Sequence, residues 1–386
     1  MNRNRFTRVA LGLGGASIVV AAALTVACDS APAPSSAESA TVLPREAFQA
    51  ILDRRVAEGV PGIVLRVETK DGEVWSGAAG VAALDGPPMM PTARLPIFSV
   101  AKMAVATAAL SLVEDGVIDL EDPIGKWVDA ATIADLPNAD RLTIRHLINQ
   151  TGGVRDYWDD DFTAAVVADT GRQWAPEELV AHAAAGAPAG SPDDGDADYA
   201  NTNYVLLGLV IEGATNSPLS AVLRDRVFEP LEMSQTASWE EATLRPQANG
   251  YIEDGGELVD VTGVDLSLSW AAGGLVSNAE DVATLTKASV LGGGVLSDET
   301  HTSVMTTFTP WNEGLEYGLG LMRVTAFGSP TYGHMGDGPG YTSLSLYDPA
   351  AGVGVVVLMN VTAEEARMQT YLEVMQALGL YDQLEE

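Results

Sequence analysis

Cysteine and histidine are scarce in this sequence of 386 residues, which contains one cysteine, Cys28, and four histidines. A single thiol excludes an intramolecular disulfide and any zinc or iron–sulfur site built from several cysteines. The sequence also has no H-E-x-x-H motif, so a metallohydrolase is not expected. The residues therefore predict no metal site.

Positive charge is scarce as well, because 21 Lys and Arg residues stand against 53 Asp and Glu residues, for a formal net charge of -32. Nucleic acids bind to basic surfaces, so they are excluded as partners. The hydrophobic share of 47% argues against a disordered acidic chain, and the length allows two to three domains. We expect an acidic globular protein that attracts neutral or cationic partners.

Several common catalytic signatures are absent. The sequence has no G-x-S-x-G elbow, no G-x-x-x-x-G-K-[ST] phosphate loop and no G-x-G-x-x-G after a strand. The acidic loop Asp193–Asp198 could hold calcium, but position 12 of a loop that starts at Asp194 is Val205 rather than Glu. A solvated acidic loop is the preferred interpretation.

The one long apolar run, Val9–Ala27, follows three arginines and precedes Cys28. This order is typical of an export signal, and its end resembles a bacterial lipobox. We therefore predict that residues 1–28 form a lipoprotein signal peptide and that Cys28 carries the lipid. An uncleaved anchor or an ordinary signal peptide stays open, because Thr25 stands where lipoboxes usually have Leu.

A lipoprotein signal peptide, an uncleaved anchor and an ordinary signal peptide would all export the protein. The lipobox predicts in addition that a lipid anchor holds the protein at a membrane on the extracytoplasmic side, in the periplasm or at the cell surface. Residues 29–43 are rich in Ala, Pro and Ser, which is typical of a flexible linker. The folded unit is expected to begin near Pro44.

Strand patterns lie near both ends of this unit and flank a helical middle. Residues 63–69, 73–79, 341–347 and 353–359 are predicted strands, and residues 44–58 and 364–378 are predicted helices. The middle contains predicted helices at 143–149, 176–185, 202–216 and 218–227. We infer a sheet domain of residues 44–121 and 252–386 with an inserted helical domain, 122–251, and expect the site in the cleft between them.

The strongest chemical motif is the pair Ser99 and Lys102 in Ser-Val-Ala-Lys, which opens a predicted helix that runs to about Asp115. Residues three apart share a helix face, so the amine lies beside the hydroxyl. A buried lysine with a lowered pKa can accept the proton of the serine. The alternative for this motif alone is a helix-capping serine followed by a surface lysine.

Two further motifs follow in order, after about 100 and then about 135 residues. Tyr199-Ala200-Asn201 precedes a predicted helix, and extended chain puts its phenol and carboxamide on one face. His334-Met335-Gly336 follows an extended segment. Taken alone, the first motif is more simply explained by a tyrosine in a turn, and the second by a packed histidine.

Together, Ser-x-x-Lys, Tyr-x-Asn and His-x-Gly resemble the three motifs of the β-lactamase-related serine hydrolases, which include class C β-lactamases, D-alanyl-D-alanine carboxypeptidases, D-aminopeptidases and related esterases. The resemblance extends over nearly all of residues 44–380, although Gln150 stands where His is common. Similar segments follow in the same order: Leu112–Gly116, Leu120–Pro123, Thr143–Ile148, Thr151–Gly153, Tyr204–Glu212, Pro230–Met233, Ala272–Leu275, Tyr317–Gly320 and Pro339–Tyr341.

The resemblance implies an α+β fold, an α/β sandwich in which an antiparallel sheet is flanked by the N- and C-terminal helices and carries an inserted helical domain. It also implies that Ser99 attacks an acyl carbon and that water hydrolyses the acyl-enzyme. Lys102 and Tyr199 share the work of general base, and which of them holds the proton stays open. No metal or organic cofactor is required.

The same resemblance assigns the substrate-binding and oxyanion residues. The backbone N–H groups of Ser99 and Asp337 are expected to hold the oxyanion. Asn201 is expected to orient Lys102 or a substrate amide. His334 replaces the lysine of many relatives, and Gly336 is expected to leave room for a substrate against the strand.

Met335 and Asp337 stand where family members that bind a substrate carboxylate often have Thr or Ser. We therefore expect a neutral or cationic acyl substrate, a small molecule or a peptide, unless Arg323 compensates. An esterase or D-amino-acid amidase is favoured over a β-lactamase or carboxypeptidase. A non-catalytic envelope lipoprotein that binds peptides or cell-wall fragments is the alternative outside catalysis, but the intact Ser99, Lys102 and Tyr199 argue against it.

Overall fold

The computed structural model describes residues 43–381 apart from residues 193, 242 and 327. The predicted signal peptide, Cys28 and nearly all of the predicted linker lie outside the described residues, as does Asp193 of the acidic loop. The description that follows therefore concerns the predicted catalytic unit.

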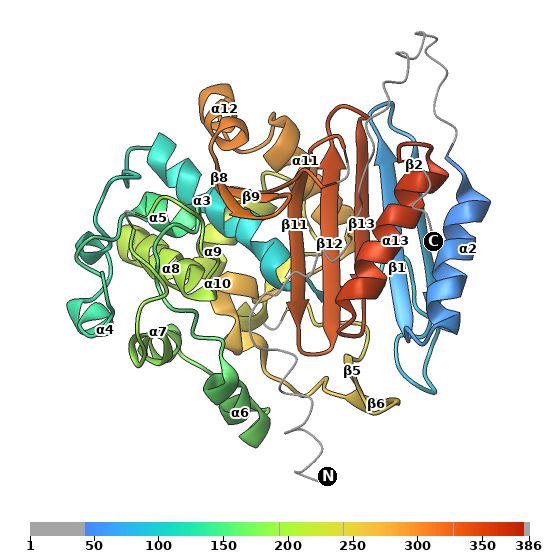
Figure 1. The fold of residues 1–386 in the computed structure, drawn as a ribbon, viewed down its shortest axis with the longest axis horizontal. Helices are drawn as coiled ribbons and strands as arrows, with labels where there is room; N and C mark the ends of the chain where they lie inside the picture. The colour runs from blue at the N-terminus through green and yellow to red at the C-terminus, as the bar shows by residue number, and fades with distance from the viewer. Residues whose placement is uncertain (1–42, 193, 242, 327, 382–386) are drawn as a thin grey trace.

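An eight-stranded sheet forms the centre of the molecule, with strand order β2-β1-β13-β12-β11-β10-β9-β8 and antiparallel pairing throughout (Figure 1). Its strands are β1 (Gly62–Thr69), β2 (Val74–Gly80), β8 (Phe308–Asn312), β9 (Leu315–Gly318), β10 (Met322–Val324), β11 (Thr331–Gly338), β12 (Tyr341–Asp348) and β13 (Val353–Met359). The four predicted strands agree with β1, β2, β12 and β13 to within one residue, and the antiparallel α+β expectation is confirmed.

The central strands are buried on both sides because helices cover both faces. β12 is buried at every position and β13 at all but one. The terminal helices α2 (Arg45–Ala57) and α13 (Glu364–Ala377) pack together on one face, whereas α11 (Ala279–Leu291) lies behind the sheet. This double cover explains the nearly continuous run of Val and Leu in β13.

The helical region lies beside the sheet and is built around α8 (Asn201–Thr215), which is buried along most of its length. The elements of this region are α4 (Ala130–Ile133), α5 (Ile144–Ile148), α6 (Asp160–Ala168), α7 (Pro176–Ala184), α9 (Leu219–Leu223), a π-helical turn (Arg224–Phe228) and α10 (Trp270–Gly273). Among the described helices, none alone is long and apolar enough to cross a membrane; α8 and Leu219–Phe228 meet that criterion only as a pair bent by 84°.

Helix α3 (Ala101–Glu114) joins the two regions, because it contacts α11 on the sheet side and α8, α9 and α10 on the helical side. α10 packs on α8 although it lies beyond residue 251, so the limits of the two predicted domains stay a prediction. The remaining elements are the short strands β3 (Leu95–Pro96), β4 (Ala237–Ser238) and β7 (Leu275–Ser277), the hairpin of β5 (Tyr251–Asp254) and β6 (Glu257–Asp260), and α12 (Asp298–Thr306).

Candidate active site

Ser99 lies in a tight 3₁₀ turn, Phe98–Val100, that leads directly into α3. Phe98 has a φ of 44°, in the left-handed region that a bulky L-residue rarely adopts. β10 pairs with β11 only as far as Gly333, so the rest of β11 leaves an open edge on that side. The Ser99 turn packs against β11, which places Ser99 beside this strand.

Two glycines of β11 allow this close approach. A Cβ on Gly338 would lie 2.1 Å from a ring carbon of Phe98. A Cβ on Gly336 would lie 2.4 Å from the carbonyl oxygen of Ile97 and 2.9 Å from the backbone nitrogen of Ser99. The space at Gly336 is thus occupied by the turn that carries Ser99, so the expectation that Gly336 leaves room for a substrate is corrected.

Lys102 lies on the first turn of α3 and is completely buried. Its Nζ is 2.8 Å from Ser99 Oγ, 2.8 Å from Asn201 Oδ1 and 2.7 Å from the carbonyl oxygen of Ala272. Burial lowers the pKa of Lys102 to about 7, and the nearby Asp156 carboxylate opposes this shift. The amine can therefore exist in its neutral form near neutral pH while it contacts the serine.

Tyr199 and Asn201 enter the site from the segment that precedes and begins α8. Buried Gln150 holds this segment, because its Oε1 accepts from the N–H of Ala200 at 3.0 Å and its carbonyl oxygen accepts from the N–H of Asp198 at 2.8 Å. The Tyr199 ring stacks on Trp311 with a centroid separation of 5.0 Å. The departure at Gln150 from the family pattern thus has a local structural role.

Lys102 Nζ also lies 4.9 Å from the centroid of the Tyr199 ring. Burial raises the pKa of the Tyr199 phenol well above its usual value, with the neighbouring Tyr317 adding to the rise and a hydrogen bond with Ser99 opposing it. The phenol therefore keeps its proton at neutral pH, whereas Lys102 can lose one. The lowered pKa of Lys102 and the raised pKa of Tyr199 favour Lys102 as the group that first accepts the serine proton.

Asp156 is a site residue that sequence reasoning missed. Its Oδ2 accepts from Asn201 Nδ2 at 3.0 Å, and its Oδ1 accepts from the N–H of Trp158 at 3.1 Å. Burial raises the pKa of Asp156 to about 6. The segment that carries it follows the Thr151–Gly153 landmark, but no spacing in the sequence connects residue 156 with residue 201.

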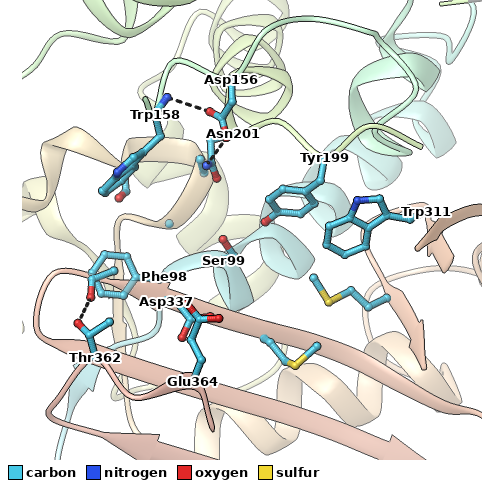
Figure 2. Close-up of a pocket in the computed structure, with 16 residues that line it drawn as sticks. Phe98, Ser99, Asp156, Trp158, Tyr199, Asn201, Trp311, Asp337, Thr362 and Glu364 are labelled. Atoms are coloured by element: carbon cyan, nitrogen blue, oxygen red, sulfur yellow. Dashed lines mark hydrogen bonds between the residues drawn. The ribbon is translucent and has the colours of Figure 1, made fainter. Parts of the chain in front are cut away.

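A pocket opens over Ser99, between the helical region and β11 (Figure 2). Ser99 lies at its centre in this view, with Tyr199 and Asn201 on one side and Asp337 on the other. Its lining residues are Phe98, Ser99, Asp156, Trp158, Tyr199, Asn201, Ser269, Ala272, Gly273, Trp311, Met322, Met335, Asp337, Gly338, Thr362 and Glu364. The structure thus brings four of the predicted residues to one pocket, with Lys102 packed beneath Ser99.

His334 does not line this pocket, so the expectation that it binds substrate directly is corrected. Its side chain is completely buried, with Nε2 3.1 Å from the Tyr317 hydroxyl and Nδ1 2.6 Å from the carbonyl oxygen of Met335. Burial and the nearby Lys102 charge lower the pKa of His334 to about 3. The imidazole is therefore a neutral packing group that contacts Tyr317 and the Met335 backbone.

Asp337 lines the pocket as expected, but its charge is paired. Both of its carboxylate oxygens accept from Arg367 Nη1, at 2.7 and 2.6 Å, and the arginine side chain is only 2% exposed. The sequence left open whether Arg323 compensates for this charge, and the structure shows that Arg367 pairs with Asp337 instead. Arg323 pairs with Glu316 and does not line the pocket, so it cannot compensate for charge there.

Glu364, at the start of α13, is a second carboxylate in the pocket that the sequence did not reveal. Burial raises its pKa, and the nearby Asp337 acts in the same direction. Among the described residues that line the pocket there is no Lys, Arg or His. Within residues 43–381, leaving aside 193, 242 and 327, no group of three or more His, Cys, Asp or Glu side chains could hold a metal ion.

Curated proteins that are similar to this chain in sequence include penicillin-binding proteins. The chain is 24% identical over 261 residues to a putative penicillin-binding protein, PbpX, of Bacillus subtilis (strain 168). That alignment covers 67% of this chain and 60% of the relative, so the chain spans less than two thirds of the relative's length.

Two solved structures share the whole fold. A D-stereospecific amidohydrolase from Streptomyces sp. is 28% identical, with a TM-score of 0.76 over 85% of this chain and 97% of the other. The D-amino acid amidase of Ochrobactrum anthropi SV3 is also 28% identical, with a TM-score of 0.77 over 86% of this chain and 98% of the other. Residues 48–378 match the Beta-lactamase family. The chain therefore belongs to the Beta-lactamase family, whose members are serine acyl hydrolases, and the resemblance inferred from its motifs is confirmed.

Proposed function

We propose that the chain hydrolyses amides or esters through an acyl-enzyme formed on Ser99, with Lys102 as the general base. The observation that carries the proposal is the 2.8 Å contact between Lys102 Nζ and Ser99 Oγ. When the lysine is neutral, its two hydrogens can be donated to the oxygens of Asn201 and Ala272 while its lone pair faces the serine hydroxyl. This geometry activates a nucleophile that is weak on its own.

In the proposed reaction, Ser99 Oγ bonds to the acyl carbon while its proton passes to Lys102. The backbone N–H groups of Ser99 and Asp337 stabilise the oxyanion that forms on the acyl oxygen. The bond to the leaving group then breaks, and the phenol of Tyr199 donates the proton that the leaving group needs and regains one from Lys102. Water attacks the acyl-enzyme by the same route and releases the acid and free Ser99.

We propose that the acyl group carries a free amine and an apolar side chain, as in a D-amino-acid amide. Two solved relatives are named for D-stereospecific amide hydrolysis. Three carboxylates, Asp156, Asp337 and Glu364, line the pocket. No cationic side chain lines it, and Arg367 pairs with Asp337 alone, so the excess of negative charge favours an ammonium group. The aromatic walls Trp158 and Trp311 offer apolar surface for the side chain.

β-Lactams and D-alanyl-D-alanine peptides are the alternative substrates, supported by the penicillin-binding relative. Both carry a carboxylate, and the pocket lining has no cationic side chain to bind it. Because Asp337 is paired with Arg367, it does not by itself disfavour these substrates. Their carboxylates are disfavoured by the excess negative charge of the pocket, to which Glu364 contributes. The esterase and amidase activities require the same acyl transfer and differ only in the leaving group.

A matched pair of substrates tests this proposal: D-phenylalanine p-nitroanilide and its N-acetyl derivative, alongside a penicillin and a D-alanyl-D-alanine peptide. The amine-bearing anilide should have the highest kcat/KM, and Ser99→Ala should lower its turnover at least a thousandfold. Ser76→Ala, on the distant strand β2, is the control and should leave turnover unchanged. Preference for a carboxylate-bearing substrate would overturn the substrate assignment, and turnover by Ser99→Ala would overturn the mechanism.

We further propose that the enzyme works at the cell envelope as a lipoprotein attached through Cys28. The support is the sequence alone: three arginines, one apolar run and the only cysteine at its end.

A non-catalytic envelope protein that binds peptides would not need a lysine with a lowered pKa beside a serine. The site geometry therefore favours catalysis.

A further inference from the structure

We propose that Asp156 is a positioning residue for the catalytic lysine, because it fixes the orientation of the Asn201 carboxamide between them. The inference rests on the proposed function, in which Lys102 acts as the base for Ser99. It adds a residue that has no place in the three motifs. Asp156 and Lys102 contact opposite ends of the Asn201 side chain rather than each other.

The chemistry of the two contacts allows only one orientation of the amide. A carboxamide has an oxygen end that accepts and an NH2 end that donates. Lys102 donates to the oxygen end both as an ammonium and as the neutral amine whose lone pair faces Ser99, and the Asp156 carboxylate can only accept. If the Asn201 amide rotated by half a turn, its NH2 group would face the hydrogens of Lys102 and its oxygen would face the Asp156 carboxylate. Lys102 and Asp156 together therefore set the orientation of the amide.

The segment that carries Asp156 is firmly attached to the start of α8. Thr202, the residue after Asn201, accepts from the N–H of Tyr157 at 2.9 Å and donates to the carbonyl oxygen of Arg155 at 2.7 Å. The Tyr157 hydroxyl donates to the carbonyl oxygen of Leu268 at 2.7 Å. The carboxylate and the carboxamide are therefore held in one rigid unit, which is how an orienting group acts at little entropic cost.

Asp156 also acts on Lys102 through charge. The ionisable groups that face the lysine are Tyr199, Tyr204, His334 and Asp156. Both phenols have raised pKa values and the imidazole has a lowered one, so at neutral pH these three are uncharged. Asp156 supplies the anionic charge in this group and keeps the pKa of Lys102 higher than burial alone would.

Two substitutions separate orientation from charge. Asp156→Ala removes both acceptors, so the Asn201 amide can rotate, and we expect kcat to fall about ten- to a hundredfold with little change in KM. Asp156→Asn keeps one acceptor but removes the charge, so more of kcat survives and the acidic limb of the pH–rate profile moves to lower pH. Asp161→Ala, an exposed carboxylate on α6, is the matched control and should leave both unchanged.

A double-mutant cycle with Asn201→Ala is the decisive test, because a residue that acts through Asn201 has nothing to orient once that side chain is gone. We expect Asp156→Ala to lower kcat in the wild type but to have less than a twofold further effect in the Asn201→Ala background. Additive losses, or a pH profile that does not move in Asp156→Asn, would overturn the inference. Turnover by Ser99→Ala would instead overturn the proposed function, so the two failures are distinguishable.

Discussion

The most unusual residue is Lys102, a lysine with no exposed surface whose ammonium form is disfavoured by burial. Its pKa falls from 10.5 to about 7. The folded protein therefore binds fewer protons than the unfolded chain between these two pH values, so this residue makes stability rise with pH across that window and costs stability below it. A group that destabilises the fold and contacts a serine is best explained by catalysis.

The first prediction concerns the pH dependence of acyl transfer. Because only the neutral amine can accept the Ser99 proton, kcat/KM should rise about tenfold per pH unit below the Lys102 pKa of about 7 and level off above it. Lys102→Met should remove this limb and lower kcat at least a hundredfold. Steady-state kinetics from pH 5 to 9 measure both effects.

Lys126→Met is the matched control, because this lysine is half exposed and pairs with Asp122 on the surface. It should keep the wild-type profile. If Lys102→Met retained the rising limb, another group would be the base. Thermal unfolding at pH 6 gives an independent reading, since loss of a buried amine in favour of an apolar side chain should raise Tm.

At the scale of elements, catalysis depends on how closely the Ser99 turn packs against β11. Gly338 provides this contact, since a methyl group at that position would lie 2.1 Å from the Phe98 ring. The ring belongs to the residue before the nucleophile, so any displacement is transmitted directly to Ser99. The glycines of the third motif and its neighbourhood thus position the nucleophile turn rather than the substrate.

Gly338→Ala should consequently impair both stability and catalysis. Overpacking of this kind costs about 1–3 kcal/mol, and displacement of Ser99 should lower kcat at least tenfold. Gly263→Ala is the control, because a Cβ there meets nothing within 4 Å. Thermal denaturation and kinetics on an activated ester measure the two effects. Wild-type kcat in a folded Gly338→Ala protein would contradict the role assigned to this contact.

The sequence predicted the elements whose signal is local. β13 and β1 have long apolar runs, and α8 and α13 agree with their predicted ranges to within one residue. The strands β8 to β10, at one end of the sheet, gave no comparable signal, because they are three to five residues long and β8 is only partly buried. Their pairing depends on neighbouring strands rather than on their own composition.

The sequence likewise predicted those site contacts that join residues close together in the chain. Ser99 and Lys102 are three residues apart, and Tyr199 and Asn201 are two apart, so their proximity is encoded locally. The contact of Asp156 with Asn201 spans 45 residues and that of Asp337 with Arg367 spans 30, so no spacing reveals them. His334 was misassigned because a family resemblance gives a position, whereas contact with Tyr317 sets the direction of the ring.

For the whole molecule, charge acts at two ranges. The net charge of -32 repels anions at long range, but salt screens it. The carboxylates Asp156, Asp337 and Glu364 act at short range inside the pocket, where Arg367 pairs with Asp337. Substrate selection should therefore depend more on the pocket than on the surface.

The predicted lipid on Cys28 would attach the whole molecule to a membrane. Cys28→Ala removes the only thiol that can be lipidated. Expressed with its full leader, the variant should be either uncleaved or released into the soluble fraction, whereas Ser30→Ala should fractionate as the wild type does. Membrane fractionation combined with the mass of the processed protein measures this. A variant that stays membrane-bound at the wild-type processed mass shows that Cys28 is not the anchor.

The central claim is that Ser99 is the nucleophile of an acyl hydrolase, and covalent labelling tests it most directly. A fluorophosphonate should form one Ser99 Oγ–P bond per chain with release of fluoride, which intact-protein mass spectrometry and peptide mapping detect. Labelling should be stoichiometric, should abolish turnover and should be absent in Ser99→Ala. An adduct on any other residue, or full activity after complete labelling, would contradict the account.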